Sequence, residues 1–142
     1  MEPTIMPGDR VLVAKFYYRF TNPARGDIIV FPSPEQIGEG NPDLIKRVIG
    51  TPGKVMREKD GRVYVNNRPL HETYTLPDRA DAKFGPYRVP RGDVFVMGDN
   101  RANSRDSRYL GPNNTIRPIN EKNIIGRAFF VYWPPNRIGI LR

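Results

Sequence analysis

Residues 97–111 read MGDNRANSRDSRYLG, and the rest of the chain is organised around this stretch. A short apolar segment, residues 94–97, runs into eleven almost wholly polar residues that include two aspartates and three arginines. Asn, Asp and Ser side chains hydrogen-bond nearby backbone groups and so favour tight turns. Carboxylates and guanidiniums can also pair bidentately and hold such a turn in place. The stretch therefore predicts either a solvated surface loop or a rigid functional loop.

The composition favours a mainly β protein. Fifteen prolines and thirteen glycines in 142 residues argue against long helices and favour short strands joined by turns. A hydrophobic fraction of 38% is sufficient for one domain with a core. The absence of cysteine excludes thiol catalysis and disulfides. Acidic residues and histidine do not recur at ligand spacing, so we predict no metal, and we expect the single histidine, His71, on an exposed loop.

Alternating apolar residues predict the individual strands. We expect strands at residues 10–15, 28–31, 43–49 and 94–97, a hairpin over 55–65 that turns at Asp-Gly, and a final strand that ends at Pro-Pro near residue 134. Two aromatic groups, residues 16–20 and 129–133, are expected to pack in the core. The alternatives are a binding face for the first group and an exposed rim at a membrane interface for the second.

Lys46 lies inside an apolar strand pattern. Side chains alternate between the two faces of a strand, so Lys46 shares a face with Leu44 and Val48. If that face is buried, the pKa of the lysine amine falls and the neutral amine can act as a general base. The alternative is that Arg47 faces inward with Ile45 and Ile49, or that Lys46 lies at an edge in solvent. The strand pattern alone does not separate these arrangements.

The net charge of +8 is compatible with a solubilising surface, a nucleic-acid surface or attraction to anionic lipid headgroups. Lysines and arginines are scattered along the chain, which argues against a nucleic-acid footprint because such a footprint requires clustering. No stretch reaches the roughly 18 to 20 apolar residues that cross a bilayer.

Four separated blocks, in the order found in one known family, identify a resemblance. They are MEPT at residues 1–4, RGDIIVF at 25–31, KRVIGTPG at 46–53 and the GDNR stretch that begins at 98, followed by a Trp-Pro pair at 133–134. Together they resemble type I signal peptidase, a membrane-anchored serine endopeptidase that uses a Ser-Lys dyad. The chain departs from the family at Lys54, where an acidic residue is usual.

The resemblance implies a fold and a function. The fold is an antiparallel β-sheet catalytic core, residues 1–55 and 89–142, with a small inserted β-hairpin subdomain at 56–88. The function is removal of signal peptides from exported preproteins by cleavage after a small residue, at an Ala-x-Ala site, without a cofactor. The partners implied are signal peptides and an anionic membrane surface, and not nucleic acid. Anchoring helices in the full-length protein would hold the catalytic domain on the extracytoplasmic face, and this fragment would be soluble.

The resemblance also assigns roles to residues. Lys46 corresponds to the general base and Ser104 to the serine that orients the lysine amine. Four loop residues correspond to those that support this arrangement: Asp99, Arg101, Asp106 and Arg108. Four apolar residues would line shallow substrate pockets, with ordinary core packing as the alternative for each: Met1, Ile5, Leu44 and Ile45.

The nucleophile is the main departure from the family. The nucleophilic serine of the family comes directly before the segment matched by residues 1–4, which places it immediately before Met1. The three serines of this chain, Ser33, Ser104 and Ser107, lie elsewhere. We therefore expect the chain as given to lack the nucleophile and to be inactive.

Two other functions compete with this one. A self-cleaving repressor peptidase shares the Ser-Lys dyad, but the GDNR block and the Trp-Pro pair argue against it. A basic β-barrel module could bind single-stranded nucleic acid through aromatic residues and positive charge. That module would show salt-sensitive oligonucleotide binding and no effect of Lys46→Ala.

Overall fold

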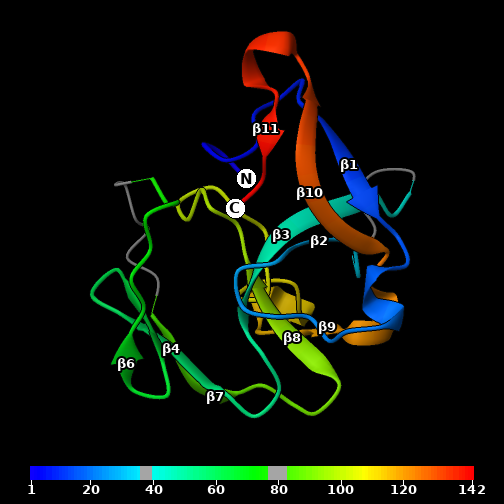
Figure 1. Cartoon of the computed structure of the whole chain (residues 1–142). Helices are drawn as coiled ribbons and strands as arrows, with labels where there is room; N and C mark the ends of the chain where they lie inside the picture. Colours follow the sequence, from blue (N-terminus) through cyan, green and yellow to red (C-terminus); the bar gives the residue numbers. More distant parts are fainter. Residues whose placement is uncertain (36–39, 77–82) are drawn as a thin grey trace.

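The computed structural model describes residues 1–35, 40–76 and 83–142, which form two antiparallel β-sheets (Figure 1). Short 3₁₀ helices occur between strands, at η1 (Tyr17–Arg19), η2 (Pro112–Asn114), η3 (Glu121–Asn123) and η4 (Pro135–Arg137). In the described ranges, no helix has the length and apolar character required to cross a membrane. The mainly β, antiparallel fold expected from the sequence is confirmed.

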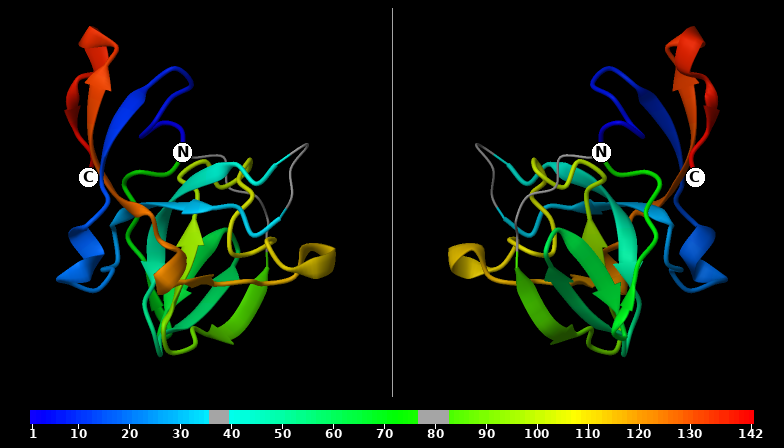
Figure 2. Two further views of the ribbon diagram at one scale, coloured as in Figure 1. Left: turned by 90° about the vertical axis from the view of Figure 1, so that its right-hand side faces the viewer. Right: turned by 90° about the vertical axis from the view of Figure 1, so that its left-hand side faces the viewer.

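The larger sheet has seven strands in the order β1-β10-β2-β3-β8-β9, with β11 beside β10. The strands are β1 (Arg10–Ala14), β2 (Ile28–Pro32), β3 (Asp43–Gly50), β8 (Asp93–Met97), β9 (Ile119–Asn120), β10 (Gly126–Trp133) and β11 (Gly139–Ile140). The strands predicted at residues 10–15, 28–31, 43–49 and 94–97 and the final strand are therefore present. Figures 1 and 2 show that β1, β10 and β11 project as an arm from the rest of the molecule.

The smaller sheet has four strands in the order β6-β5-β4-β7. They are β4 (Val55–Lys59), β5 (Arg62–Val65), β6 (Arg68–Pro69) and β7 (Phe84–Arg88). The predicted hairpin is β4–β5, and its turn residues Asp60 and Gly61 have φ of 50° and 67°, the left-handed values that favour Asp-Gly. An inserted subdomain at 56–88 stays a prediction, and its residues 77–82 lie outside the described part of the chain.

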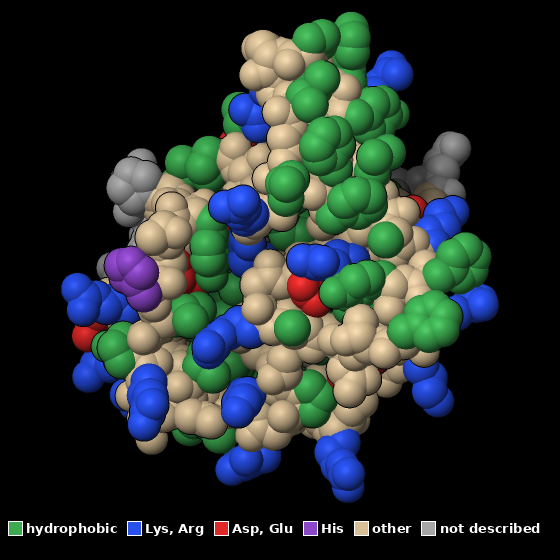
Figure 3. Space-filling view, in the orientation of Figure 1, with side chains coloured by type: hydrophobic (Ala, Val, Ile, Leu, Met, Phe, Trp, Pro, Cys, Tyr) green, Lys and Arg blue, Asp and Glu red, His purple; other side chains and the backbone are tan. Residues whose placement is uncertain are grey.

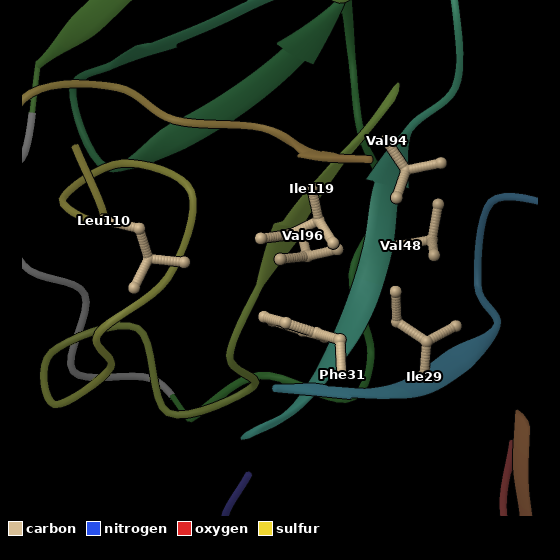
Figure 4. Close-up of a cluster of buried hydrophobic side chains, with 7 residues drawn as sticks. All are labelled: Ile29, Phe31, Val48, Val94, Val96, Leu110 and Ile119. Atoms are coloured by element: carbon tan, nitrogen blue, oxygen red, sulfur yellow. The ribbon is translucent and has the colours of Figure 1, made fainter. Parts of the chain in front are cut away.

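Strand β8 separates two of the hydrophobic clusters. Its residues alternate between the faces of the sheet, so Val94 and Val96 join one cluster while Phe95 and Met97 join another. Figure 4 shows the first cluster, which consists of Ile29, Phe31, Val48, Val94, Val96, Leu110 and Ile119. The second cluster contains residues from β4 and β5 as well as from β3 and β8. The smaller sheet is therefore packed against the strands that carry the site described below.

The expectation that residues 16–20 pack in the core is wrong. Phe16 is 61% exposed and Phe20 is 89% exposed, because the chain turns there through the 3₁₀ helix η1. The guanidinium of Arg19 lies 4.6 Å from the centre of the Phe16 ring, which covers part of that ring without burying it. Only Tyr18 of this group packs partly against the core.

The core placement expected for residues 129–133 is also wrong for its largest members. Trp133 is 49% exposed and Phe129 is 39% exposed. The cause is the position of β10 in the projecting arm. There a small cluster buries Ala128 and Val131 but leaves Phe129 and Trp133 uncovered. Figure 3 shows hydrophobic side chains gathered over this arm. The exposed-rim alternative describes the observed surface better.

Candidate active site

Lys46 lies on β3, opposite Ile29 of the neighbouring strand β2. Strand alternation puts it on the face shared with Leu44 and Val48, as expected, and Val48 is fully buried there. Burial lowers the pKa of the Lys46 amine below the ordinary lysine value; the charges of Asp106 and Asp99 oppose this shift. A larger fraction of neutral amine is therefore present near neutral pH than in a solvated lysine, as a general base requires.

Arg47 is the next residue and faces the opposite side of the sheet, where it is 1% exposed. Its guanidinium donates two hydrogen bonds to Asp99, of 2.9 and 2.7 Å. It also donates to the carbonyl oxygens of Gly26 and Arg142, each at 3.1 Å. The two arrangements weighed from the sequence therefore occur together, since Arg47 is buried and Lys46 is partly buried. The resemblance assigned no role to Arg47.

Gly98 is the first residue of the polar loop after β8, and the loop holds both of its backbone groups. The N–H donates to the Asp106 carboxylate at 3.0 Å, and the carbonyl accepts from Arg101 Nε at 3.0 Å. A Cβ atom on Gly98 would lie 2.6 Å from Ser104 Cβ and 3.8 Å from Lys46 Cδ. Ser104 and Lys46 therefore approach the same glycine, and a side chain at this position would clash with Ser104.

The Asp106 carboxylate accepts two hydrogen bonds from the Arg108 guanidinium, both of 2.9 Å, and the pair is buried. Arg108 also donates to the Arg101 carbonyl at 3.0 Å, which closes the loop on itself. Glu58 on β4 lies 3.5 Å from Arg108. Burial raises the pKa of the Glu58 carboxyl, and the charge of Arg108 opposes that shift.

The other two loop residues named from the resemblance take partners that the sequence did not indicate. Asp99 pairs with Arg47 and also accepts from the Thr4 hydroxyl. Arg101 pairs with Glu72, whose side chain is completely buried. Arg47 could have been suspected, because a second cation in an apolar strand implies a partner. Glu72 gave no signal, since residues 71–76 have no clear periodicity.

Met1, Ile5 and Ile45 line one cavity of about 290 Å³, together with Glu2, Met6, Pro7, Asn100 and Asn103. The fourth predicted substrate-binding residue, Leu44, instead packs against the cluster that contains Val48, on the face of β3 that also carries Lys46 and not on the face of Ile45. Burial lowers the pKa of the Met1 amino group, and the charge of Lys46 lowers it further. The amino end of Met1 therefore lies within electrostatic reach of the Lys46 amine.

The two remaining serines accept hydrogen bonds from backbone N–H groups. Ser107 is buried and accepts from the Val96 N–H at 3.0 Å, while Ser33 accepts from the Glu35 N–H at 3.2 Å. His71 is exposed. Within the described ranges, no three histidine, aspartate or glutamate side chains are grouped as metal ligands would be.

Ser104 Oγ is buried and has no hydrogen-bond partner among the described residues. We expect Ser104→Ala to leave the free energy of unfolding within about 0.5 kcal/mol of the parent, because no bond to that oxygen is lost. If Ser104 orients the lysine amine, the same change lowers kcat by about 10- to 100-fold in an active form of the protein. Urea unfolding and initial-rate kinetics measure the two effects, and an unchanged kcat would remove Ser104 from the site.

Comparison with known proteins places this chain in a family. Residues 1–133 match the profile of the family described as "Signal peptidase, peptidase S26". The chain is 44% identical to signal peptidase I of Leptolyngbya laminosa over 145 residues, which cover 99% of this chain and 68% of the relative. It is 37% identical to thylakoidal processing peptidase 1 of Arabidopsis thaliana, over 97% of this chain and 41% of that protein.

A solved structure shows the same relationship in three dimensions. The crystal structure of a signal peptidase I from Enterococcus faecalis V583 superimposes with a TM-score of 0.59 at 31% sequence identity. The match covers 75% of this chain and 97% of that one. Fold and sequence together define a β-sheet peptidase. The chain belongs to the signal peptidase family, peptidase S26.

Proposed function

We propose that this chain carries the catalytic machinery of a signal peptidase, which removes signal peptides from exported preproteins with Lys46 as the general base. The observation that carries the proposal is the partly buried Lys46, whose amine has a lowered pKa and whose side chain approaches Gly98 together with Ser104. Family membership supports the reaction class, and the cavity that Met1 lines together with Ile45, the neighbour of Lys46, supports the position of the nucleophile.

The proposed nucleophile is a serine joined to the amino end of Met1. Its hydroxyl attacks the peptide carbonyl, and the neutral Lys46 amine accepts the hydroxyl proton. The resulting ammonium then gives a proton to the leaving amine, and an acyl-enzyme forms. Water activated by Lys46 hydrolyses that ester and regenerates the serine. This is the Ser-Lys form of the triad logic, with the nucleophile's own backbone N–H stabilising the oxyanion.

The edge of β3 supports an extended substrate. Strand β2 pairs with residues 43–47 on one side, but the ladder with β8 begins only at Arg47 on the other. Residues 43–46 therefore have no strand partner on that side among the described residues. A substrate strand can add there by backbone hydrogen bonds. The cavity lined by Met1, Ile5 and Ile45 lies beside this edge and is small, which suits small side chains near the cut.

The surface supports a location close to a membrane in the full-length protein. Exposed apolar side chains of the projecting arm include Leu12, Trp133, Ile138 and Ile140. Aromatic residues favour the membrane interface, and a net charge of +8 favours anionic headgroups. This location is part of the proposal and agrees with a substrate that is delivered at the membrane.

A cleavage assay tests the proposal. The substrate is a preprotein with an Ala-x-Ala site, in detergent, and the proteins are the chain as given and the same chain with a serine and a short lead-in joined before Met1. We expect cleavage only with the joined serine, with a kcat at least about 10³-fold above the chain as given, because the nucleophile is indispensable. An alanine at the joined position is the matched control. Equal cleavage by all three proteins would contradict the proposed mechanism.

A further inference from the structure

The segment after β6, residues 71–76, reaches the polar loop through a buried carboxylate. Glu72 accepts hydrogen bonds from both terminal nitrogens of Arg101, with Nη1 at 2.9 Å, and its side chain is 0% exposed. A buried carboxylate is costly unless its partner geometry is good, so the bidentate pairing holds Arg101 in one orientation. Neither the sequence nor the resemblance assigned a role to Glu72.

Arg101 transmits this constraint to the site. Its Nε atom donates to the Gly98 carbonyl at 3.0 Å, and its two terminal nitrogens donate to Glu72. The same guanidinium therefore joins Glu72 to Gly98. Gly98 is the residue that Ser104 and the Lys46 side chain approach. A rotation of the Gly98 peptide would move the wall against which both side chains pack. Glu72 therefore acts on the site through its contact with Arg101 and the contact of Arg101 with Gly98.

Tyr74 connects Glu72 to the buried ion pair of Arg47 and Asp99. Its hydroxyl donates to Glu72 at 3.0 Å, and its ring lies 4.0 Å from the guanidinium carbon of Arg47. Arg47 in turn pairs with Asp99. Burial raises the pKa of the Tyr74 phenol, so the hydroxyl stays protonated and remains a donor. Tyr74 thus contacts one member of the Arg101–Glu72 pair and one member of the Arg47–Asp99 pair.

We propose that Glu72 and Tyr74 are positioning residues, which hold the Gly98 peptide so that Ser104 and Lys46 face the substrate. The inference rests on the proposed function, because it assigns these residues to the same site. It differs from simple anchoring of the smaller sheet, because anchoring would affect the amount of folded protein and not the rate per folded molecule. Misplacement of reacting groups by about 1 Å costs about 100-fold in rate.

The charges that act on Lys46 identify how the effect would arise. Asp106 and Asp99 raise the pKa of the amine, while burial and Arg108 lower it. Glu72 is not among these groups, so its replacement acts on Lys46 by moving the loop. A displaced loop exposes the amine to water, which moves its pKa upward toward the ordinary lysine value.

The test compares Glu72→Gln and Tyr74→Phe with Thr73→Val, an exposed neighbour, all in the chain with the joined serine. Gln keeps the size of Glu72, and Phe keeps the ring beside Arg47. We measure kcat and KM per folded molecule and titrate Lys46 by NMR of its ¹³C-labelled Cε. We expect kcat to fall about 10- to 100-fold for Glu72→Gln and about fivefold for Tyr74→Phe. KM should stay within about twofold and the Lys46 pKa should rise, with no change for Thr73→Val.

Two results would overturn the inference, and both are separable from failure of the proposed function. Unchanged kcat per folded molecule and unchanged Lys46 titration, with only a loss of stability, would show that Glu72 and Tyr74 are anchors. If the parent with the joined serine cleaves nothing, the proposed function fails. The titration of Lys46 then decides alone whether Glu72 and Tyr74 position the site. In that case an unchanged titration overturns the positioning role, and an upward shift supports it.

Discussion

Replacing Lys46 by alanine in the chain with the joined serine will lower kcat for preprotein cleavage by about 10³- to 10⁴-fold. The partly buried Lys46 amine has a lowered pKa and lies close to the position proposed for the nucleophile. Without a base, the serine hydroxyl is a weak nucleophile near neutral pH. Initial rates with the Ala-x-Ala substrate measure the effect. Lys15→Ala is the matched control, because Lys15 is exposed, and it should cleave at the parental rate.

The same position should show a conflict between activity and stability. Because the pKa of Lys46 is lower in the folded state, its contribution to stability is complete above the unfolded pKa and is lost as pH falls through the folded pKa. Near neutral pH the partial burial of the Lys46 side chain therefore lowers the stability of the folded state. Lys46→Met should raise the free energy of unfolding by about 1 kcal/mol there, with a smaller gain at higher pH. A loss of stability would mean that the amine is better solvated than its surroundings indicate.

Replacing Asp99 by alanine should lower the free energy of unfolding by about 3 to 5 kcal/mol. Asp99 is fully buried and accepts two hydrogen bonds from Arg47, which is 1% exposed. Removal of the carboxylate leaves a guanidinium in the interior without its counter-charge. Urea unfolding measures the change, and Asp43→Ala, an exposed site on the same strand as Arg47, should stay within about 0.5 kcal/mol of the parent.

A double substitution separates the ion pair from packing at the same place. Arg47→Met combined with Asp99→Leu removes both charges and fills similar volume, so we expect most of the lost stability to return. The Tyr74 ring, 4.0 Å from the Arg47 guanidinium, would then lie against an apolar side chain. If the double variant is as unstable as Asp99→Ala alone, the cost lies in the packing of the loop and not in an unpaired charge.

The parts of the fold that depend on local pattern could be predicted from the sequence. Alternation marked β1, β2, β3 and β8, and the Asp-Gly pair marked the β4–β5 turn, because these signals need only neighbouring residues. The aromatic groups were assigned incorrectly, because hydrophobicity does not tell whether other chain segments cover a strand. In the projecting arm the covering cluster is small, and Trp133 stays half exposed.

In the candidate site, too, the features that depend on local pattern could be predicted from the sequence. Strand alternation placed Lys46 with Leu44 and Val48, and the loop composition suggested that its carboxylates and guanidiniums would pair, as Asp106 and Arg108 do. The long-range partners could not be read from the chain. Glu72 lies 29 positions before Arg101, and Asp99 lies 52 positions after Arg47, so their pairing depends on the tertiary fold. Sequence pattern specifies which groups need partners but not which partners they take.

The pH dependence of kcat/KM for the chain with the joined serine tests the central claim most directly. If neutral Lys46 is the base, the rate rises with pH through a single ionisation of the free enzyme. The midpoint should lie below the ordinary lysine pKa, because burial lowers the pKa of Lys46, and it should match the NMR titration of that residue. Two results together would contradict the account: a midpoint near the ordinary histidine pKa, and loss of this pH dependence in His71→Ala. They would identify the exposed His71 as the base.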